Sequence, residues 1–430
     1  MKGIVISAPN SGSGKTILTS GLIKALMDLN YTVFPCKTGP DYIDTAFLGR
    51  AAKYMAQNLD MHLQGDIKHA IDVEKDLCIV EGAMGYFDGI YNTFENSSFN
   101  IAKNLNLDTV LIYTPKGEMF SAIPKIKGMV DFAGNIKGII FNRISKHYYE
   151  LLKSALEQHV DIKVLGFIEE KDDYILQSRH LGLIQSSEIE DIDKKVNTMA
   201  ENIKKNIDIE TMLSLFKDVE AFKKAKYDKT GFRAAIAMDK AFSFYYRENL
   251  EILNSLFDVT YFSPIEDDKL PECDFLYLGG GYPEVFKKEL SRNKTMLNSI
   301  RQYSQNGGYI FAECGGLMYL TKEIDGFEMT GVFDGISYMT DRLQNFGYVD
   351  VEIKNDCLIG KKGDKFTGHE FHKSLSQINC VNLLTVKKTM GNRITECGYQ
   401  VNNTFAMYQH VSFLGSFNII ENIISNMKGE

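Results

Sequence analysis

Two short segments of this chain, separated by about three hundred residues, combine residue types that could do chemistry. The first reads Ser11-Gly12-Ser13-Gly14-Lys15-Thr16, and the second reads Ala312-Glu313-Cys314-Gly315-Gly316. A glycine-rich loop that opens a helix can bind phosphate through its backbone N–H groups. A cysteine between small residues on a strand-to-helix turn is presented as a nucleophile. The pair of segments therefore predicts nucleotide-driven chemistry coupled to thiolate chemistry.

The first segment predicts an ATP site. Gly12, Ser13 and Gly14 would curl the backbone around phosphate oxygens, the Lys15 ammonium would neutralise them, and the Thr16 hydroxyl would bind magnesium. The full pattern GxxxxGK[ST] asks for glycine where this chain has Pro9, but the order of strand, tight loop and helix fits. A glycine-rich turn with an exposed lysine is the alternative.

Carboxylates that follow the next strands predict a Mg²⁺ site. Asp41 and Lys37 follow or end the second strand, and Glu81 and Asp88 follow the third. Ligands of open parallel sheets bind beyond the carboxyl ends of the strands, where such loops meet. Because Mg²⁺ prefers oxygen ligands, Asp41 and Glu81 are its candidate carboxylates. A turn or helix-cap role is the competing interpretation for each of them.

The second segment predicts a thiol nucleophile with an oxyanion hole. The positive end of the following helix would favour the thiolate form of Cys314. The backbone N–H of Gly315 could bind an oxyanion, and Gly280 in Gly279-Gly280-Gly281 could supply a second donor. A plain tight turn is the alternative for the glycine run.

A thiol nucleophile also requires a proton acceptor, which is most often histidine. His410 lies just beyond a late β-like run, and His369 and His372 are its rivals. Spacing alone does not choose among the three.

Apolar runs between helical patterns predict the elements that must position these residues. Continuous apolar runs are typical of strands covered on both faces, and helical spacing of Leu18, Leu22, Leu26 and Leu29 predicts the first helix. We expect a doubly wound parallel α/β sheet followed by a second α/β domain. The predicted strands contain residues 4–6, 32–34, 77–80, 110–112 and 138–141, then 233–238, 259–262, 275–278 and 309–312.

A charged stretch separates the two halves and predicts a domain boundary. We expect a P-loop domain over residues 1–188, a helical connector over 189–231 and a second domain over 232–430. A solvated face on the last helix of the first domain would give the same pattern.

Composition excludes several classes of function. The chain has 430 residues with 44% hydrophobic and 24% charged residues, and its formal charge is -8, which argues against a nucleic-acid surface. No apolar run predicts a membrane span and no signal pattern opens the chain, so we expect a cytoplasmic protein. The seven cysteines form no CxxC pair, so neither a disulfide framework nor a structural zinc site is expected.

Taken in order, the motifs resemble those of the cobyrinic acid a,c-diamide synthase family over nearly the whole chain. The resemblance implies a dethiobiotin synthetase-like N-terminal domain, a C-terminal class I glutaminase domain, and ATP-dependent amidation of a tetrapyrrole polycarboxylate with ammonia from L-glutamine in cobalamin biosynthesis. The matching segments are Ser11–Thr16, Lys37–Asp44, Glu81–Gly89, Arg179–Leu183, Gly279–Glu284, Ala312–Leu320 and Gly368–Ser374.

Carried onto this chain, the resemblance implies roles for single residues. Cys314 would form a thioester with glutamine and His410 would be its base, while Lys37 would lie near the ATP phosphates. The positions associated with the macrocycle and its carboxylates are Tyr42, Ile43, Glu81 and Asp88.

One departure from the family pattern concerns the histidine. Family members show His-x-His near the C-terminus, whereas Ser412 stands here in place of the second histidine. Class I glutaminases with a full triad carry a glutamate at that position, so the sequence predicts a Cys-His dyad without an identified orienting group.

Two other functions compete with this one. Nickel-sirohydrochlorin a,c-diamide synthase shares the architecture and chemistry, and a P-loop switch or partition-type ATPase would bind DNA or protein without transferring an amide. The sequence does not determine the oligomeric state, and a homodimer is one arrangement that we consider.

Overall fold

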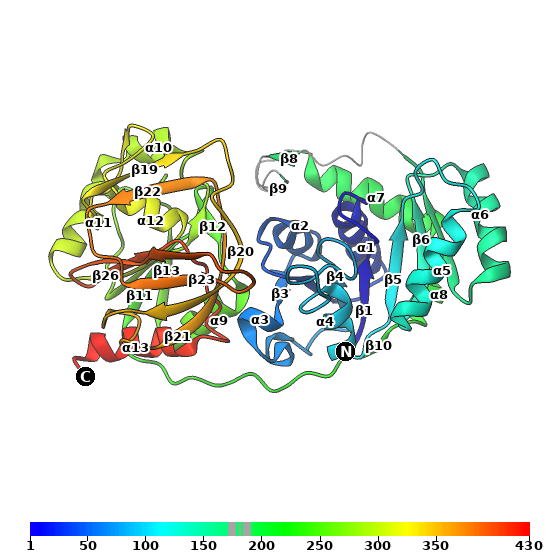
Figure 1. Ribbon diagram of the computed structural model, residues 1–430, viewed down its shortest axis with the longest axis horizontal. Coiled ribbons are helices and arrows are strands. Elements are labelled where there is room, and N and C mark those ends of the chain that lie inside the picture. Colours follow the sequence, from blue (N-terminus) through cyan, green and yellow to red (C-terminus); the bar gives the residue numbers. More distant parts are fainter. Residues whose placement is uncertain (171–177, 180–181, 184–190) are drawn as a thin grey trace. The chain divides into compact units, whose positions relative to one another are not determined.

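The computed structural model describes residues 1–170, 178–179, 182–183 and 191–430. Its contacts divide the chain into two compact units, which Figure 1 draws in the colours of the sequence. Unit 1 comprises Met1–Met61 and Asp66–Lys224, and unit 2 comprises His62–Gly65 and Ala225–Glu430.

Unit 1 is built on a sheet in the order β3-β2-β4-β1-β5-β6-β7, in which all neighbours along this path are parallel. The short β10 pairs antiparallel with the start of β1. Buried apolar side chains dominate these strands, as expected for a sheet covered on both faces. The strands are β1 (Lys2–Ser7), β2 (Val33–Thr38), β3 (Gln57–Leu59), β4 (Leu77–Glu81), β5 (Thr109–Tyr113), β6 (Ile136–Asn142), β7 (Lys163–Ile168) and β10 (Lys217–Asp218).

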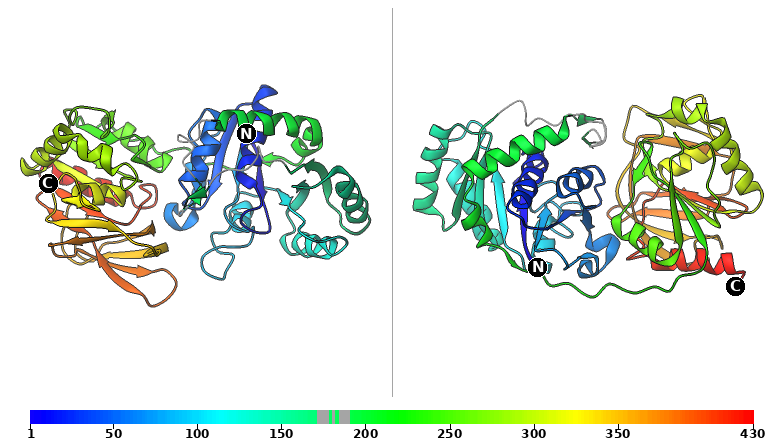
Figure 2. Two further views of the ribbon diagram at one scale, coloured as in Figure 1. Left: turned by 90° about the horizontal axis from the view of Figure 1, so that it is seen from above. Right: turned by 180° about the vertical axis from the view of Figure 1, so that it is seen from behind.

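Helices lie on both faces of this sheet, as the left view of Figure 2 shows for the green α7 on one side and the cyan α5 and α6 on the other. The strand order reverses beside β1. From β1 the chain runs to β2 and β3 on one side, returns to β4 between β2 and β1, and then crosses to β5 on the other side of β1. Ligand sites of doubly wound sheets lie at such a switch point. The helices are α1 (Lys15–Asp28), α2 (Ile43–Ala52), α4 (Ser98–Asn104), α5 (Ala122–Ala133), α6 (Lys146–His159), α7 (Ile192–Asn206) and α8 (Ile209–Leu213).

The helices that the sequence assigns to a connector, α7 and α8, belong to unit 1. α7 packs on α1 at Gly21, where an added Cβ would lie 2.3 Å from Cγ of Met199. The apolar face of α7, which contains Val196, Met199 and Ile203, is buried. The chain passes to unit 2 between residues 224 and 225.

Unit 2 contains a central sheet in the order β13-β11-β14-β16-β26-β25, whose pairs are parallel except for β25 with β26. The strands are β11 (Arg233–Ala237), β13 (Asp258–Phe262), β14 (Phe275–Leu278), β16 (Tyr309–Glu313), β25 (Tyr399–Val401) and β26 (Thr404–Met407). The helices of this unit are α9 (Arg247–Leu256), α10 (Lys287–Arg292), α11 (Lys294–Gln305), α12 (Gly315–Leu320) and α13 (Phe417–Lys428).

Unit 2 also holds antiparallel sheets that the sequence analysis does not anticipate. One has the order β21-β20-β23-β24 and another the order β18-β17-β19-β22, in which only β17 and β19 run parallel. Their strands are β17 (Glu323–Ile324), β18 (Phe327–Glu328), β19 (Gly335–Met339), β20 (Asn345–Ile353), β21 (Lys365–His372), β22 (Ser374–Ile378), β23 (Leu384–Lys388) and β24 (Ile394–Cys397). A small ribbon pairs β12 (Phe242–Phe244) with β15 (Gly280–Gly281).

The predicted α/β fold and all nine predicted strands are confirmed; their ends shift by at most two residues, except that β2 continues to Thr38, four residues beyond the predicted end. One apolar position was assigned wrongly: α1 ends at Asp28, and Leu29 is 47% exposed. In the motif Arg179–Leu183, residues 180 and 181 lie outside the described residues. No helix in the described part of the chain is long and apolar enough to span a membrane.

Candidate active sites

The glycine-rich loop between β1 and α1 has the backbone of a phosphate-binding turn. Gly12 and Gly14 adopt φ of 75° and 78°, a left-handed conformation that favours glycine. Asn142, at the end of β6, donates from Nδ2 to the Ser13 carbonyl oxygen at 2.8 Å, and Arg143 Nη1 donates to the Gly12 carbonyl oxygen at 3.2 Å. These bonds engage the carbonyl groups of the loop, so its N–H groups at the start of α1 can bind an anion.

The ammonium of Lys15 is held by backbone oxygens beside this loop. Its Nζ donates to the Met84 carbonyl oxygen at 2.6 Å and to the Asn10 carbonyl oxygen at 3.2 Å. Burial, reinforced by the nearby charge of Lys37, lowers the pKa of Lys15 to about 8. A bound polyphosphate would supply the negative charge that this buried ammonium lacks.

A buried cluster of charges lies at the ends of β2 and β4. Lys37 Nζ lies 2.6 Å from Glu81 Oε1 and 2.6 Å from Asp44 Oδ2, and Thr16 Oγ1 donates to Glu81 Oε1 at 2.9 Å. Burial raises the pKa of Glu81, although Lys37 opposes it. The other carboxylate oxygen of Glu81 is buried and has no hydrogen-bond partner in the described part of the chain. An oxygen of this kind suits a cation that arrives with the nucleotide.

Asp41 caps the helix that carries Tyr42 and Ile43 at its start. Asp41 Oδ1 accepts hydrogen bonds from the Ile43 and Asp44 backbone N–H groups at 2.7 and 3.0 Å. This is the helix-cap role that competes with metal binding. Burial, and then the neighbouring Asp44, raise the pKa of Asp41 to about 6. Tyr42 immediately precedes α2, and Ile43 is its first, buried residue.

Asp88 orders the loop that follows β4. Its Oδ2 accepts a hydrogen bond from the Gly85 backbone N–H at 3.0 Å. An added Cβ on Gly85 would lie 2.5 Å from that oxygen and 2.5 Å from the Pro9 carbonyl oxygen, so only glycine fits between them. The loop thereby holds Met84, whose carbonyl oxygen receives Lys15.

The residues of unit 1 fit a magnesium nucleotide better than a resident metal. Within residues 1–170 and the other described segments, no group of three or more His, Cys, Asp or Glu side chains could hold a metal ion. Mg²⁺ that binds with a nucleotide takes most of its ligands from phosphate and water. The Thr16 hydroxyl donates to the Glu81 carboxylate, so two oxygens of the kind that Mg²⁺ prefers lie side by side.

In unit 2, Cys314 occupies a strained turn between β16 and α12. Its φ is 47° and its ψ is -102°, an uncommon conformation for a residue with a side chain. The Cys314 backbone N–H donates to the Met407 carbonyl oxygen at 2.8 Å, and the Gly316 N–H donates to the Gly279 carbonyl oxygen at 3.0 Å. These bonds hold the turn against β26 and the end of β14. The geometry is that of a nucleophile elbow.

His410 follows β26 and reaches Cys314 from the neighbouring strand. Burial lowers the pKa of His410, but its hydrogen bond and charge interaction with Cys314, together with Glu313, outweigh burial and raise that pKa to about 10. A pKa of about 10 favours the imidazolium form of His410 at neutral pH. The Glu313 carboxylate lies on its other side, with Oε2 at 3.8 Å from His410 Nδ1.

The two rival histidines lie in other environments. The His369 backbone exchanges two hydrogen bonds with that of His410, at 3.0 and 2.9 Å, and burial lowers the pKa of the His369 imidazole to about 3. The His372 ring stacks on Tyr408 at a centroid distance of 4.0 Å, and burial lowers its pKa too. His410 is the histidine with a described hydrogen bond and charge interaction with Cys314, so it is the candidate base of this site.

The predicted oxyanion glycines lie close to the thiol site. An added Cβ on Gly315 would lie 3.1 Å from the Gly281 backbone nitrogen. An added Cβ on Gly280 would lie 2.3 Å from Cε1 of His410, so the absence of a side chain at Gly280 makes room for the imidazole. The sequence analysis did not foresee this second use of Gly280.

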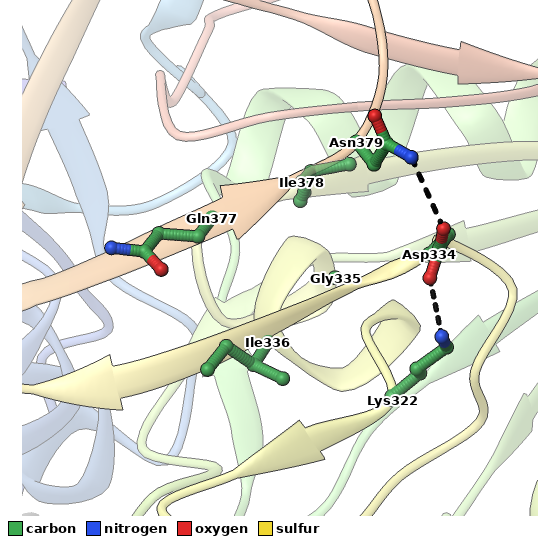
Figure 3. Close-up of a pocket in the computed structure, with 7 residues that line it drawn as sticks. All are labelled: Lys322, Asp334, Gly335, Ile336, Gln377, Ile378 and Asn379. Carbon is green, nitrogen blue, oxygen red and sulfur yellow. Dashed lines mark hydrogen bonds and ion pairs between the residues drawn. The ribbon is translucent and has the colours of Figure 1, made fainter.

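A pocket elsewhere on unit 2 holds none of these residues. Its volume is about 450 Å³, and it is lined by Lys322, Asp334, Gly335, Ile336, Gln377, Ile378 and Asn379. Figure 3 shows that Asp334 is contacted by both Lys322 and Asn379, so the charged groups of this pocket pair with one another. The pocket contains neither a nucleophile nor a base.

Comparison with known proteins first defines the class of protein. Residues 4–183 match the CobQ/CobB/MinD/ParA nucleotide binding domain, and residues 233–417 match the CobB/CobQ-like glutamine amidotransferase domain. The chain is thus a glutamine amidotransferase with a nucleotide-binding domain.

Relatives over the whole length then define the family. The chain is 44% identical to cobyrinate a,c-diamide synthase of Clostridium tetani, with 99% of this chain and 100% of that protein covered. It is 42% identical to the enzyme of the same name from Clostridium acetobutylicum, with 99% and 100% covered. The Limosilactobacillus reuteri enzyme is 38% identical, with 99% of each chain covered. The chain belongs to the cobyrinate a,c-diamide synthase family.

Some residues at these sites belong to no motif that the sequence analysis identified. In the sequence, Glu313 stands out only as the neighbour of Cys314. Asn142 and Arg143 stand out only because they directly follow a predicted strand. Polar residues directly after a parallel strand are a usable signal, because the ends of neighbouring strands meet. For Glu313 no local signal exists, since its contact with His410 depends on the pairing of two distant strands.

Proposed function

We propose that this chain converts the a and c acetate carboxylates of cobyrinate into amides, with ammonia from L-glutamine and energy from ATP. The single observation that carries the proposal is the pairing of Cys314, on its strained turn, with the imidazole of His410. The relatives named cobyrinate a,c-diamide synthase support this substrate over nickel-sirohydrochlorin.

The glutaminase half of the reaction belongs to unit 2. The Cys314 thiolate attacks the side-chain amide carbon of glutamine, and the Gly315 N–H binds the oxyanion that forms. The C–N bond then breaks, and the imidazolium of His410 gives its proton to the departing ammonia. Water hydrolyses the resulting thioester to glutamate and returns a proton to the imidazole.

The synthetase half belongs to unit 1. The N–H groups of Gly12, Ser13 and Gly14, with the ammonium of Lys15, bind the phosphates of ATP. The γ-phosphoryl group passes to a substrate carboxylate, which gives ADP and an acyl phosphate. Ammonia attacks the carbonyl carbon of this acyl phosphate, and phosphate leaves as the amide forms. Each substrate molecule consumes two ATP and two glutamine for its two amides.

We assign Mg²⁺ to Thr16 and Glu81, because their oxygens touch and the second Glu81 oxygen lacks a hydrogen bond in the described segments. The ion would neutralise charge on the transferred phosphoryl group. Asp41 remains a weaker candidate for this ion, since one of its oxygens caps α2. We propose that the Lys37 ammonium balances the charge of the Glu81 carboxylate beside the ATP phosphates.

We propose that the macrocycle of the substrate and its carboxylates bind at Tyr42, Ile43, Glu81 and Asp88. Tyr42 and Ile43 stand at the start of α2, next to the cluster of Lys37 and Glu81. Asp88 lies on the loop whose Met84 carbonyl oxygen receives Lys15.

The test is to supply the purified chain with ATP, Mg²⁺ and glutamine, and to compare cobyrinate with nickel-sirohydrochlorin by product mass. We expect a diamide from cobyrinate, with two carboxylate OH groups replaced by NH₂. A diamide from nickel-sirohydrochlorin alone would assign the chain to the other substrate. Hydrolysis of ATP without an amide from either acid would contradict the proposal.

A cytoplasmic location stays a prediction, and so does a homodimer. The molar mass in solution, measured by light scattering during gel filtration, tests the homodimer directly.

A further inference from the structure

The side chain of Glu313 has a set of contacts that the Cys314–His410 pair alone does not explain. Glu313 is the last residue of β16 and directly precedes the nucleophile. β16 pairs in parallel with β26, so that Glu313 lies opposite Met407 and His410 follows three residues later. The carboxylate and the imidazole therefore emerge at the same edge of the sheet.

Two donors fix the position of the Glu313 carboxylate. The Tyr277 hydroxyl donates to Glu313 Oε2 at 2.8 Å, and the Val411 backbone N–H donates to Oε1 at 3.1 Å. Burial raises the pKa of Tyr277 well above its usual value, so its hydroxyl stays a donor. Glu313 itself is only 1% exposed. Burial and the two fixed donors hold the Glu313 carboxylate in one orientation.

The Glu313 carboxylate faces the imidazole of His410. Glu313 Oε2 lies 3.8 Å from His410 Nδ1, on the nitrogen that a group orienting the ring would contact. The His410 ring lies close to Gly280, because an added Cβ on Gly280 would lie 2.3 Å from Cε1 of the ring. The imidazole is thus bounded by Gly280, Glu313 and Cys314.

The residue that the class I pattern would use for this purpose is engaged elsewhere. Ser412, two residues after His410, donates from its hydroxyl to Glu248 Oε1 at 2.8 Å. The groups that raise the pKa of His410 most are Cys314 and Glu313.

We propose that Glu313 is the positioning residue of His410, so that the glutaminase uses a Cys-His-Glu triad whose carboxylate comes from the residue before the nucleophile. This inference rests on the proposed function of unit 2. Its physical reason is the tetrahedral intermediate: once the Cys314 sulfur has bonded to the amide carbon and lost its charge, the Glu313 carboxylate still faces the imidazolium. It holds the ring until the proton passes to ammonia.

Other titratable groups that face His410 do not replace this charge. His369 and His372 interact with His410 electrostatically, but burial keeps both imidazoles neutral. The Cys314 sulfur can interact as an anion only before it bonds to the substrate, whereas the contact between Glu313 and His410 does not depend on the state of the sulfur.

The experiment compares Glu313→Gln, Glu313→Asp and Glu370→Gln with the wild type. Glu370 is a matched control because it is a buried carboxylate of the same unit whose described bonds go to Gln409 at 2.7 Å and to Lys388 at 3.0 Å. Glutamate release from glutamine is measured across pH 6–10, and amide formation from ammonium chloride is measured in parallel.

We expect Glu313→Gln to lower kcat for glutamine about tenfold to a hundredfold with little change in KM. The basic limb of its kcat/KM profile should move to lower pH, because the imidazolium loses its carboxylate. Glu313→Asp keeps the charge and should recover part of both changes, whereas Glu370→Gln should leave the limb in place. Ammonia-dependent synthesis should persist in all three variants.

The inference is overturned if folded Glu313→Gln keeps the wild-type kcat and basic limb. It is also overturned if Glu313→Gln and Glu370→Gln change both quantities equally, since that would indicate a structural role. Failure of the proposed function looks different: the wild type would then form no amide with either nitrogen source, while the glutamate-release profile would still report on Glu313.

Discussion

The ammonium of Lys37 and the carboxylate of Glu81 form an ion pair that is buried from solvent, with Nζ and Oε1 2.6 Å apart. The side chains are 2% and 0% exposed. Asp44 lies at the same distance from the same ammonium. Two carboxylates against one ammonium leave an excess negative charge beside Thr16, and a divalent cation that arrives with a nucleotide would balance it.

Replacing Lys37 should destabilise unit 1 more than any exposed lysine would. Lys37→Met leaves two buried carboxylates without their partner, and we expect a loss of about 3–5 kcal/mol in the free energy of unfolding. Urea denaturation measures it. Lys294→Met is the control, because its pair with Glu328 is half-exposed and should contribute less than about 1 kcal/mol. Equal losses in the two variants would contradict the importance of the buried pair.

Removing the ammonium of Lys15 should abolish synthesis with either nitrogen source. Lys15→Ala takes away the charge that would face the phosphates, so neither glutamine nor ammonia should give an amide, while glutamine hydrolysis in the absence of ATP should remain. Product mass and glutamate release measure the two activities. Ammonia-dependent turnover at the wild-type rate would exclude this role for Lys15.

Binding of ATP should take up a proton near pH 8.5 but not near pH 6.5. Burial lowers the pKa of Lys15 to about 8, so at the higher pH the free protein holds much of this amine in its neutral form. A bound polyphosphate favours the ammonium, and the proton must then come from the buffer. Titration calorimetry in two buffers of different ionisation enthalpy measures it. The uptake should vanish in Lys15→Ala; its persistence there would assign the proton to another group.

Cys314→Ala should separate the two halves of the reaction. Only the source of nitrogen is lost, so glutamine-dependent amide should disappear while ammonia-dependent amide persists at near the wild-type rate. Cys380→Ala is the matched control, because this partly buried thiol of unit 2 only donates to the Gln400 carbonyl oxygen at 3.4 Å. Loss of both activities in a folded Cys314→Ala protein would contradict the division of labour.

Gly280→Ala should inactivate the glutaminase through a single methyl group. The added Cβ would lie 2.3 Å from His410 Cε1 and force the imidazole away from Cys314, so we expect glutamate release to fall about a hundredfold or more. Gly128→Ala is the control, since nothing lies within 4 Å of a Cβ on that helical residue. Retained glutamate release in Gly280→Ala would show that the ring tolerates the displacement.

Much of both sites could be predicted from the sequence, because their signals are local. The run Gly12-Ser13-Gly14-Lys15 forms its turn from glycine conformations alone, and the elbow at Cys314 follows from an apolar strand, small neighbours and a helix. The fold class follows in the same way from apolar runs of strand length.

The remaining features depend on strand pairing. Glu313 contacts His410 across nearly a hundred residues, and Lys37 meets Glu81 because β2 and β4 pair in register at these two residues. The antiparallel sheet of β20 and β21 also arises from pairing, and its strands carry little continuous apolar sequence. No spacing rule within one segment could find these contacts.

The parallel ladder between β16 and β26 fixes where both strands stop, with Glu313 opposite Met407. Inserting or deleting one residue in either strand would slide the imidazole by about 3.3 Å relative to the sulfur, which is more than a hydrogen bond tolerates. Length changes in these two strands would therefore inactivate the enzyme, whereas the exposed tip of the hairpin at residues 390–392 can grow or shrink.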